Sequence, residues 1–202
     1  MKIKNILFTA VLVISFVSCQ DKKKDGNTAP DATYSLETDA TIENSKKEKE
    51  IEAPQIKVEV KSKSGSQVSG TVVFTEINNV VKMMAEFENL KPRTVHAIHL
   101  HDTADCSTHD AKSTGGHWNP TSNKHGKWGD DQGYHRGDIG NFTADENGKA
   151  TVNFETDEWC ISCQDTTRTI NGRGIIIHQG QDDYKTQPTG DAGIRIACGA
   201  IL

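Results

Sequence analysis

The sequence has no stripe of basic residues, no long amphipathic helical pattern and no apolar run long enough to cross a membrane comfortably. Its 202 residues carry a formal net charge of -5, which makes nucleic-acid binding a poor hypothesis. Hydrophobic residues make up only 34% of the chain, a low share for one globular domain of this length. These absences favour a strand-based domain with extra segments that do not contribute to a core.

The N-terminal segment accounts for one of these extras. A positive start followed by a short apolar run at residues 6–17 is typical of an export signal, and we predict that residues 1–18 are a signal peptide. The junction at Cys19 resembles a bacterial lipobox, in which the cysteine is lipidated and becomes the mature N-terminus. The alternative is an ordinary cleaved signal with an incidental cysteine. We expect export to the bacterial cell envelope, in the periplasm or on the outer-membrane face, with a membrane anchor at Cys19.

Residues 19–55 contain few large apolar side chains and many charged and small polar ones. Such a segment cannot bury enough surface to offset the entropy lost on ordering. We therefore predict a disordered tether that begins at the lipid-anchor cysteine. The folded domain is expected over residues 56–202.

From Ile56 onward, apolar and polar residues alternate, which predicts half-buried strands. Asn78-Asn79 lies between two such runs and predicts a hairpin turn, as does Asn147-Gly148 further on. Later strands are expected at 141–143, 150–155, 174–178 and 193–198. Short strands separated by turns indicate an antiparallel sandwich or barrel.

Two long stretches, 102–137 and 156–173, contain few apolar residues and need something other than a core to order them. Disulfides are one candidate, because export leads to an oxidising compartment. Besides Cys19 the chain has four cysteines, for which three pairings are open: Cys106, Cys160, Cys163 and Cys198. The Cys160-x-x-Cys163 pair is interpreted as a disulfide that staples its loop. A redox-active or metal-binding pair, or pairing with the other two cysteines, is the alternative.

Metal binding is the second candidate. His99 and His101 lie two residues apart on a predicted strand, so both imidazoles point to one face, as in sites for zinc or copper. Alone, this pair could equally be two exposed histidines. His178 ends an apolar strand, where a lone histidine is more often a satisfied core residue. Here it can complete a nitrogen-only, copper-type site with the first pair.

The first long loop holds three more histidines and an aspartate. Three imidazoles and one carboxylate form a tetrahedral set that suits zinc and would order a loop without a core. The four residues are His117, His125, His135 and Asp138.

Six ordered segments now resemble the copper–zinc superoxide dismutase family. They are HAIHLH (96–101), GGHWNP (115–120), KHG (124–126), HRGDIGN (135–141), HQGQDD (178–183) and GDAGIRIACG (190–199). The resemblance covers residues 56–202. It implies an all-β fold, a Greek-key β-barrel or sandwich of about eight antiparallel strands with two long ordered loops.

The resemblance also implies site roles and cofactors, with one copper and one zinc per chain. The copper ligands would be His99, His101, His117 and His178, and the zinc ligands His117, His125, His135 and Asp138. His117 would bridge both metals, and Asp182 would hydrogen-bond a ligand histidine of each. Arg195 would lie beside the open copper position, although on the residues alone it is a solvated strand arginine. The implied family disulfide joins Cys106 and Cys198.

The implied activity is dismutation of superoxide to dioxygen and hydrogen peroxide by a redox-cycling copper bridged to a structural zinc. Alternatives are a copper/zinc-binding or copper-delivery module without catalysis, and a surface domain that binds zinc only. His96 is expected to pack, His109 to be exposed, and Trp118, Trp128 and Trp159 to pack rather than act. Superoxide is the expected small-molecule partner. The family includes monomers and dimers, so a homodimer is one expectation.

Overall fold

The computed structural model describes residues 53–202. The predicted signal peptide, Cys19 and nearly all of the predicted tether lie outside the described residues. Within the described part, no helix has the length and apolar character needed to span a membrane.

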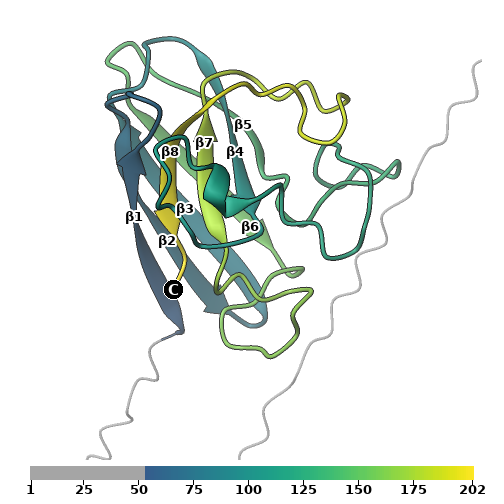
Figure 1. Ribbon diagram of the computed structural model, residues 1–202. Helices are drawn as coiled ribbons and strands as arrows, with labels where there is room; N and C mark the ends of the chain where they lie inside the picture. The colour runs from purple at the N-terminus through teal and green to yellow at the C-terminus, as the bar shows by residue number, and fades with distance from the viewer. Residues whose placement is uncertain (1–52) are drawn as a thin grey trace, which may run out of the picture. The chain divides into compact units, whose positions relative to one another are not determined.

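Eight β-strands make up the regular structure of residues 53–202 (Figure 1). They are β1 (Gln55–Ser62), β2 (Ser69–Ile77), β3 (Val80–Glu88), β4 (Val95–His101), β5 (Gly140–Thr143), β6 (Ala150–Thr156), β7 (Gly174–His178) and β8 (Arg195–Ala200). One short 3-10 helix, η1 (Lys112–Thr114), lies in the long loop between β4 and β5. The all-β prediction is therefore confirmed.

The strands form one antiparallel sheet in the order β5-β4-β7-β8-β1-β2-β3-β6. Its two end strands, β5 and β6, follow each other in the chain and touch, so the sheet nearly closes into a barrel. The connections from β3 to β4 and from β6 to β7 join strands that are not neighbours, as in Greek-key folds. Near closure leaves little free strand edge.

Alternation along the strands sorts the side chains between the core and the outside. On β3, Val81, Met83, Ala85 and Phe87 are buried, while the residues between them are exposed. The predicted turn between β2 and β3 is also present, since Asn78 and Asn79 have φ angles of 52° and 63°. Positive φ at both central positions matches the twist of a hairpin, and asparagine tolerates it.

Strand β8 begins and ends two residues later than the alternation predicts. Gly193 has a φ of 80°, far from the extended values typical of strands, so the expected start falls in the loop before the strand. At the other end, Gly199 and Ala200 continue the pairing with β7, opposite Ile175 and Gly174. Glycine and alanine do not show the alternation of apolar and polar side chains that marks a strand. The sequence pattern therefore did not indicate that these two residues belong to β8.

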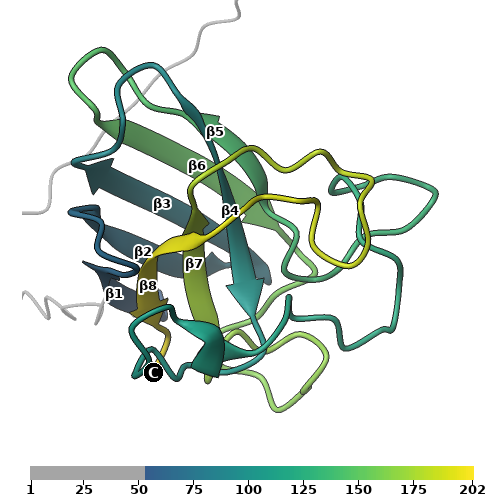
Figure 2. The ribbon, with the colours of Figure 1, turned by 45° about the horizontal axis from the view of Figure 1, so that its top comes forward.

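Two long loops lie together on one side of the barrel, outside β4 and β7 (Figure 2). They are the loop between β4 and β5, residues 102–139, and the loop between β7 and β8, residues 179–194. The Gln187 side chain joins them, because its Oε1 accepts from the His125 backbone N–H at 2.9 Å and its Nε2 donates to the His125 carbonyl at 2.8 Å. Both loops contribute to the site described next.

Candidate metal centre

Four histidines from three parts of the chain meet on the outside of the barrel. His99 and His101 project from β4 to one face, while Ile98 and Leu100 fill the core on the other, as the strand period requires. His178 ends β7, which pairs with β4. An isolated bridge between His101 and His117 brings the loop histidine to the same place. Their ring nitrogens lie within 4.8 Å of one another, and all four side chains are buried.

Each of three imidazoles donates one ring N–H to a fixed acceptor. His99 Nε2 donates to Asp182 at 2.9 Å, His101 Nδ1 to the Gly115 carbonyl at 3.0 Å, and His178 Nδ1 to the Gly193 carbonyl at 3.2 Å. Carbonyl and ionised carboxylate oxygens only accept, so these contacts fix the tautomer. The other ring nitrogen therefore carries a free lone pair.

Those lone pairs have no hydrogen-bond partner among residues 53–202. The buried ring nitrogens without a hydrogen-bond partner include His99 Nδ1, His101 Nε2, His117 Nε2 and His178 Nε2. Burying an unpartnered polar atom costs about 1–3 kcal/mol, so four in one place need a compensating ligand. A nitrogen-only set of this kind fits copper.

The second cluster forms around the carboxylate of Asp138, which is fully buried. Its Oδ1 lies 2.8 Å from His117 Nδ1 and 3.4 Å from His135 Nδ1, and its Oδ2 lies 3.0 Å from His125 Nδ1. Backbone N–H groups of His135 and Gly126 donate to Oδ2 and hold the carboxylate in place. Three imidazoles and one carboxylate within 4.8 Å of one another fit zinc. His117 belongs to both clusters and presents one ring nitrogen to each.

Asp182 connects the two clusters. Its Oδ2 accepts from His99 Nε2 and its Oδ1 from His125 Nε2, both at 2.9 Å. Two residues that the sequence did not assign hold this carboxylate. Asn141 exchanges two hydrogen bonds of 2.8 Å with the Asp182 backbone, and the Tyr184 N–H donates to Oδ1 at 2.7 Å. Such outer partners orient the ligand rings.

The protonation of the histidines differs between the clusters. Burial, together with the neighbouring His99, lowers the pKa of His117 to about 4, and burial lowers the pKa values of His101 and His178 well below their ordinary range. These three rings are therefore neutral near pH 7, the state that binds a metal.

In the zinc-type cluster the carboxylates dominate. Burial acts to lower the pKa of His125, but hydrogen bonds with Asp138 and Asp182 outweigh it and raise this pKa to about 9. Burial acts to raise the pKa of Asp138, yet its hydrogen bonds to the histidines hold it far below the ordinary value. Without a metal, His125 thus keeps a proton between two carboxylates, at a place where a cation is favoured.

Arg195 begins β8 and does not extend into solvent as the solvated-arginine alternative requires. Its guanidinium donates to the Ala111 carbonyl at 2.8 Å, Thr114 Oγ1 at 3.1 Å and the Gly115 carbonyl at 2.8 Å. The Gly115 carbonyl also accepts from His101, so a fixed positive charge lies next to the copper-type cluster.

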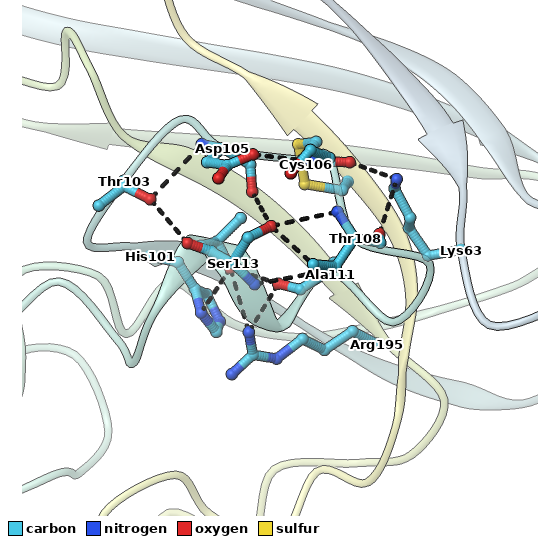
Figure 3. Close-up of a disulfide and its surroundings, with 12 residues drawn as sticks. Lys63, His101, Thr103, Asp105, Cys106, Thr108, Ala111, Ser113 and Arg195 are labelled. Atoms are coloured by element: carbon cyan, nitrogen blue, oxygen red, sulfur yellow. Dashed lines mark hydrogen bonds between the residues drawn. A yellow bond between two sulfur atoms is a disulfide. The ribbon is translucent and has the colours of Figure 1, made fainter.

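A disulfide holds the segment that anchors Arg195. Cys106 and Cys198 are bonded, with their Cα atoms 5.9 Å apart, and link the 102–139 loop to β8 (Figure 3). The Lys63 ammonium adds contacts to the Cys106 and Thr108 carbonyls from the barrel side. Cys160 and Cys163 form the second disulfide. The pairing left open by spacing is thereby settled for all four cysteines of the described residues.

The remaining singled-out residues lie apart from the clusters. His96 bonds the His178 carbonyl and Thr94 Oγ1 and packs on Phe142, and His109 is exposed. Trp118 and Trp159 are buried, and Trp128 packs against the core.

Gly190 is a further residue that sequence reasoning left without a role. A Cβ at this position would lie 1.9 Å from Asp182 Oδ1 and 2.6 Å from His125 Nε2, and the φ of 68° suits glycine. We expect Gly190→Ala to separate the two side chains and to weaken zinc binding by at least about tenfold, the usual cost of a lost outer partner. Competition with a coloured chelator measures the affinity.

Gly129→Ala is the matched control for this prediction. Gly129 lies in the other long loop, residues 102–139, with a similar φ of 80°, but no atom of residues 53–202 outside its chain neighbours lies within 4 Å of a Cβ there. Both variants carry the backbone cost of about 1–2 kcal/mol for a left-handed alanine. Equal zinc affinities in the two variants would show that the close approach of Gly190 to Asp182 has no influence on the metal.

A family model and individual related proteins both match this chain, and they point to the same family. The model of the family described as "Copper/zinc superoxide dismutase (SODC)" matches residues 68–201. Superoxide dismutase (Cu-Zn) 1 of Aquifex aeolicus is 34% identical over 134 residues, which cover 65% of this chain and 79% of that protein. The superoxide dismutase (Cu-Zn) of Paramecium bursaria Chlorella virus 1 is 36% identical over 140 residues, covering 66% and 72%.

Solved structures of proteins with different names share the fold. A SOD-like protein from Bacillus subtilis has 28% identity and a TM-score of 0.65, covering 72% of this chain and 97% of its own. The clock protein EA4 has 30% identity and a TM-score of 0.64, covering 74% and 96%. A shared fold does not by itself carry a function, so the site must carry the functional argument.

Proposed function

The chain belongs to the copper/zinc superoxide dismutase family, and we propose that it converts two superoxide anions and two protons into dioxygen and hydrogen peroxide. The observation that carries the proposal is the convergence of four unpartnered, buried imidazole nitrogens next to a fixed arginine. His99, His101, His117 and His178 would hold copper, and His117, His125, His135 and Asp138 would hold zinc, one ion of each per chain. Copper would supply the one-electron redox change, and zinc, which has no redox chemistry, would hold the loop and His117 in place.

The protein side chains provide three further parts of the reaction. Arg195 attracts a small anion and orients it, since its guanidinium is held by three acceptors and presents its charge beside His101. His117 Nε2 is buried on the copper side without a hydrogen-bond partner among the described residues, so it is the atom at which a proton can be held there. Asp182 keeps His99 and His125 in their tautomers, so both clusters keep their geometry.

The decisive experiment is to load the purified chain with copper and zinc and to follow superoxide decay by pulse radiolysis. If the protein catalyses the decay of superoxide, the result supports the proposal. If superoxide decays no faster with the fully metallated protein than in buffer alone, the copper/zinc-binding or copper-delivery alternative is favoured instead. Zinc uptake without copper uptake would favour the zinc-only surface domain.

Arg195→Gln separates catalysis from metal storage. We expect superoxide decay to slow by about tenfold, within the range that electrostatic attraction adds to association rates, and to lose part of its salt dependence. Copper content should stay the same, because Arg195 is not among the four candidate copper ligands. Arg93→Gln is the control, since Arg93 is exposed and pairs with Glu146 away from both clusters. An unchanged rate at low ionic strength in the Arg195 variant would contradict this role.

We also propose that the protein acts in the bacterial cell envelope and is anchored by a lipid at Cys19. The N-terminal pattern supports this, as do two disulfides, which persist in oxidising compartments. Cys19→Ser should abolish incorporation of labelled palmitate and release the protein from the membrane fraction. Incorporation equal to that of the unchanged protein would contradict lipidation at Cys19.

A further inference from the structure

The loop between β6 and β7 contacts the segment that carries His135 through side chains of both. Tyr134 and Arg136 stand on either side of this zinc-type ligand, and both of their side chains reach the same carboxylate. The Tyr134 hydroxyl donates to Glu158 Oε1 at 2.6 Å, and the Arg136 guanidinium forms an ion pair with Glu158 Oε2. The ion pair is largely shielded from water, with 22% and 30% of the two side chains exposed. It therefore escapes most of the screening that weakens surface pairs.

The next residue adds a third contact to the same segment. The indole N–H of Trp159 donates to the Arg136 carbonyl at 2.8 Å. Trp159 is fully buried and packs on Phe74 of β2 and Phe154 of β6, with ring centroids 6.2 and 5.0 Å away. Trp128 joins this aromatic cluster from the His125–His135 stretch. Glu158 and Trp159 thus connect the backbone and side chains around His135 to the barrel wall.

The Cys160–Cys163 disulfide follows these two residues directly. The Cys160 N–H donates to the Arg168 carbonyl, and the Cys160 carbonyl accepts from the Ile170 N–H. The Ile161 N–H donates to Glu76 Oε2 at the end of β2, at 2.8 Å. The disulfide closes a tight turn between these anchors, so the chain at Glu158 and Trp159 has little freedom to move.

The length of the closed loop indicates what this disulfide does. The stabilisation that a disulfide provides by restricting the unfolded chain grows with the loop it closes. Its cysteines are 3 residues apart in sequence, against 92 for Cys106–Cys198. Its contribution to global stability is therefore the smaller of the two, and local positioning is its main effect.

We propose that Glu158 and Trp159 are positioning residues for His135, and that the Cys160–Cys163 disulfide sets the zinc affinity by holding them in place. The inference rests on the proposed zinc site. It makes zinc retention sensitive to thiols. A dithiol reductant would give two electrons and two protons to the Cys160–Cys163 disulfide, yielding two thiols and its own disulfide. Cys163 is the accessible sulfur, because Cys160 is buried and Cys163 only partly so.

Glu158→Gln tests the positioning role without touching the disulfide. It removes the charge that pairs with Arg136 and keeps an oxygen for Tyr134. We expect zinc affinity of the metal-free protein, measured by chelator competition, to fall about tenfold. Co²⁺ placed in the zinc site should show weaker visible absorption, because its intensity depends on tetrahedral geometry. Glu155→Gln is the control, as Glu155 is exposed on β6 and pairs with Lys82 away from His135.

The double variant Cys160→Ser, Cys163→Ser tests the disulfide. We expect the same loss of zinc affinity and the same change in Co²⁺ absorption, while the melting temperature of the metal-free protein changes little. Adding Glu158→Gln to this variant should produce little further loss, since both changes act on one contact set. Unchanged zinc affinity in either variant would overturn the inference. So would a loss of zinc affinity with an unaltered Co²⁺ spectrum.

These outcomes are distinct from failure of the proposed function. If the unchanged protein binds zinc through His135 but does not accelerate superoxide decay, the dismutase proposal fails and the positioning role stands. If activity is present and the Glu158 and cysteine variants keep their zinc, the positioning role fails alone.

Discussion

His178→Ala should remove copper and superoxide dismutation while leaving zinc in place. His178 supplies one of four nitrogens to the copper-type cluster and none to the zinc-type cluster. Loss of an outer partner already costs about 10–100-fold in metal affinity, and loss of a ligand should cost more. Activity is therefore expected to fall to the level of the metal-free protein. Metal analysis after dialysis against a chelator, together with pulse radiolysis, measures both quantities.

The His178 variant has a matched control in His109→Ala. His109 is exposed and belongs to neither cluster, so its loss should change neither metal content nor rate. Retained activity in His178→Ala would mean that the copper ligands are assigned incorrectly. Loss of both metals would mean that the copper-type and zinc-type clusters do not bind their metals independently, although His178 belongs only to the first.

Asp138→Asn should weaken zinc binding strongly, because Asp138 is the one carboxylate among the four zinc-type ligands. The carboxylate contacts three histidines and accepts two backbone hydrogen bonds, all without exposure to water. An amide replaces one oxygen by an NH₂ group, which cannot bind a cation and would face either a histidine or a backbone N–H. We expect zinc affinity to fall by more than about a hundredfold, beyond the range for outer partners.

The same variant should also loosen the loop. Residues 115–138 contain few apolar side chains, so a bound metal would provide much of their order. Faster amide hydrogen exchange in this segment of the zinc-treated protein, relative to Asp131→Asn, is the expected result. Asp131 is exposed in the same loop and serves as the control. Equal zinc affinity in the two variants would rule out Asp138 as a ligand.

The regular part of the fold was accessible to sequence reasoning, because it depends on local geometry. Alternation along residues 81–87 reflects the two faces of a strand, and the Asn78-Asn79 turn needs residues that tolerate positive φ. The His99–His101 pair followed from the same period of two. Strand β8 was misplaced by two residues at each end because glycine and alanine mark no face.

The candidate site was accessible in a different way. The residues alone indicated the four zinc-type ligands and three of the copper-type histidines. The sharing of His117 by both metals, the roles of Asp182 and Arg195 and the Cys106–Cys198 pairing came from the resemblance of six segments to a family. The residues alone left the cysteine pairing open and made Arg195 a solvated side chain. Asn141, Tyr184 and Gly190 received no role, although Asn141 and Gly190 lie in the matching segments, because their effect depends on contacts across two loops.

An all-β domain with two clusters of ligand-type residues could be predicted from the residues alone, since strand period, turn chemistry and side-chain identity are local properties. Three features became visible in the folded chain alone: which ring nitrogen faces each cluster, what fixes the Arg195 guanidinium and how Glu158 reaches both neighbours of His135. These depend largely on backbone carbonyls and on side chains distant in the chain. Every residue has a carbonyl, so no pattern of residue types shows which one will lie within hydrogen-bonding distance.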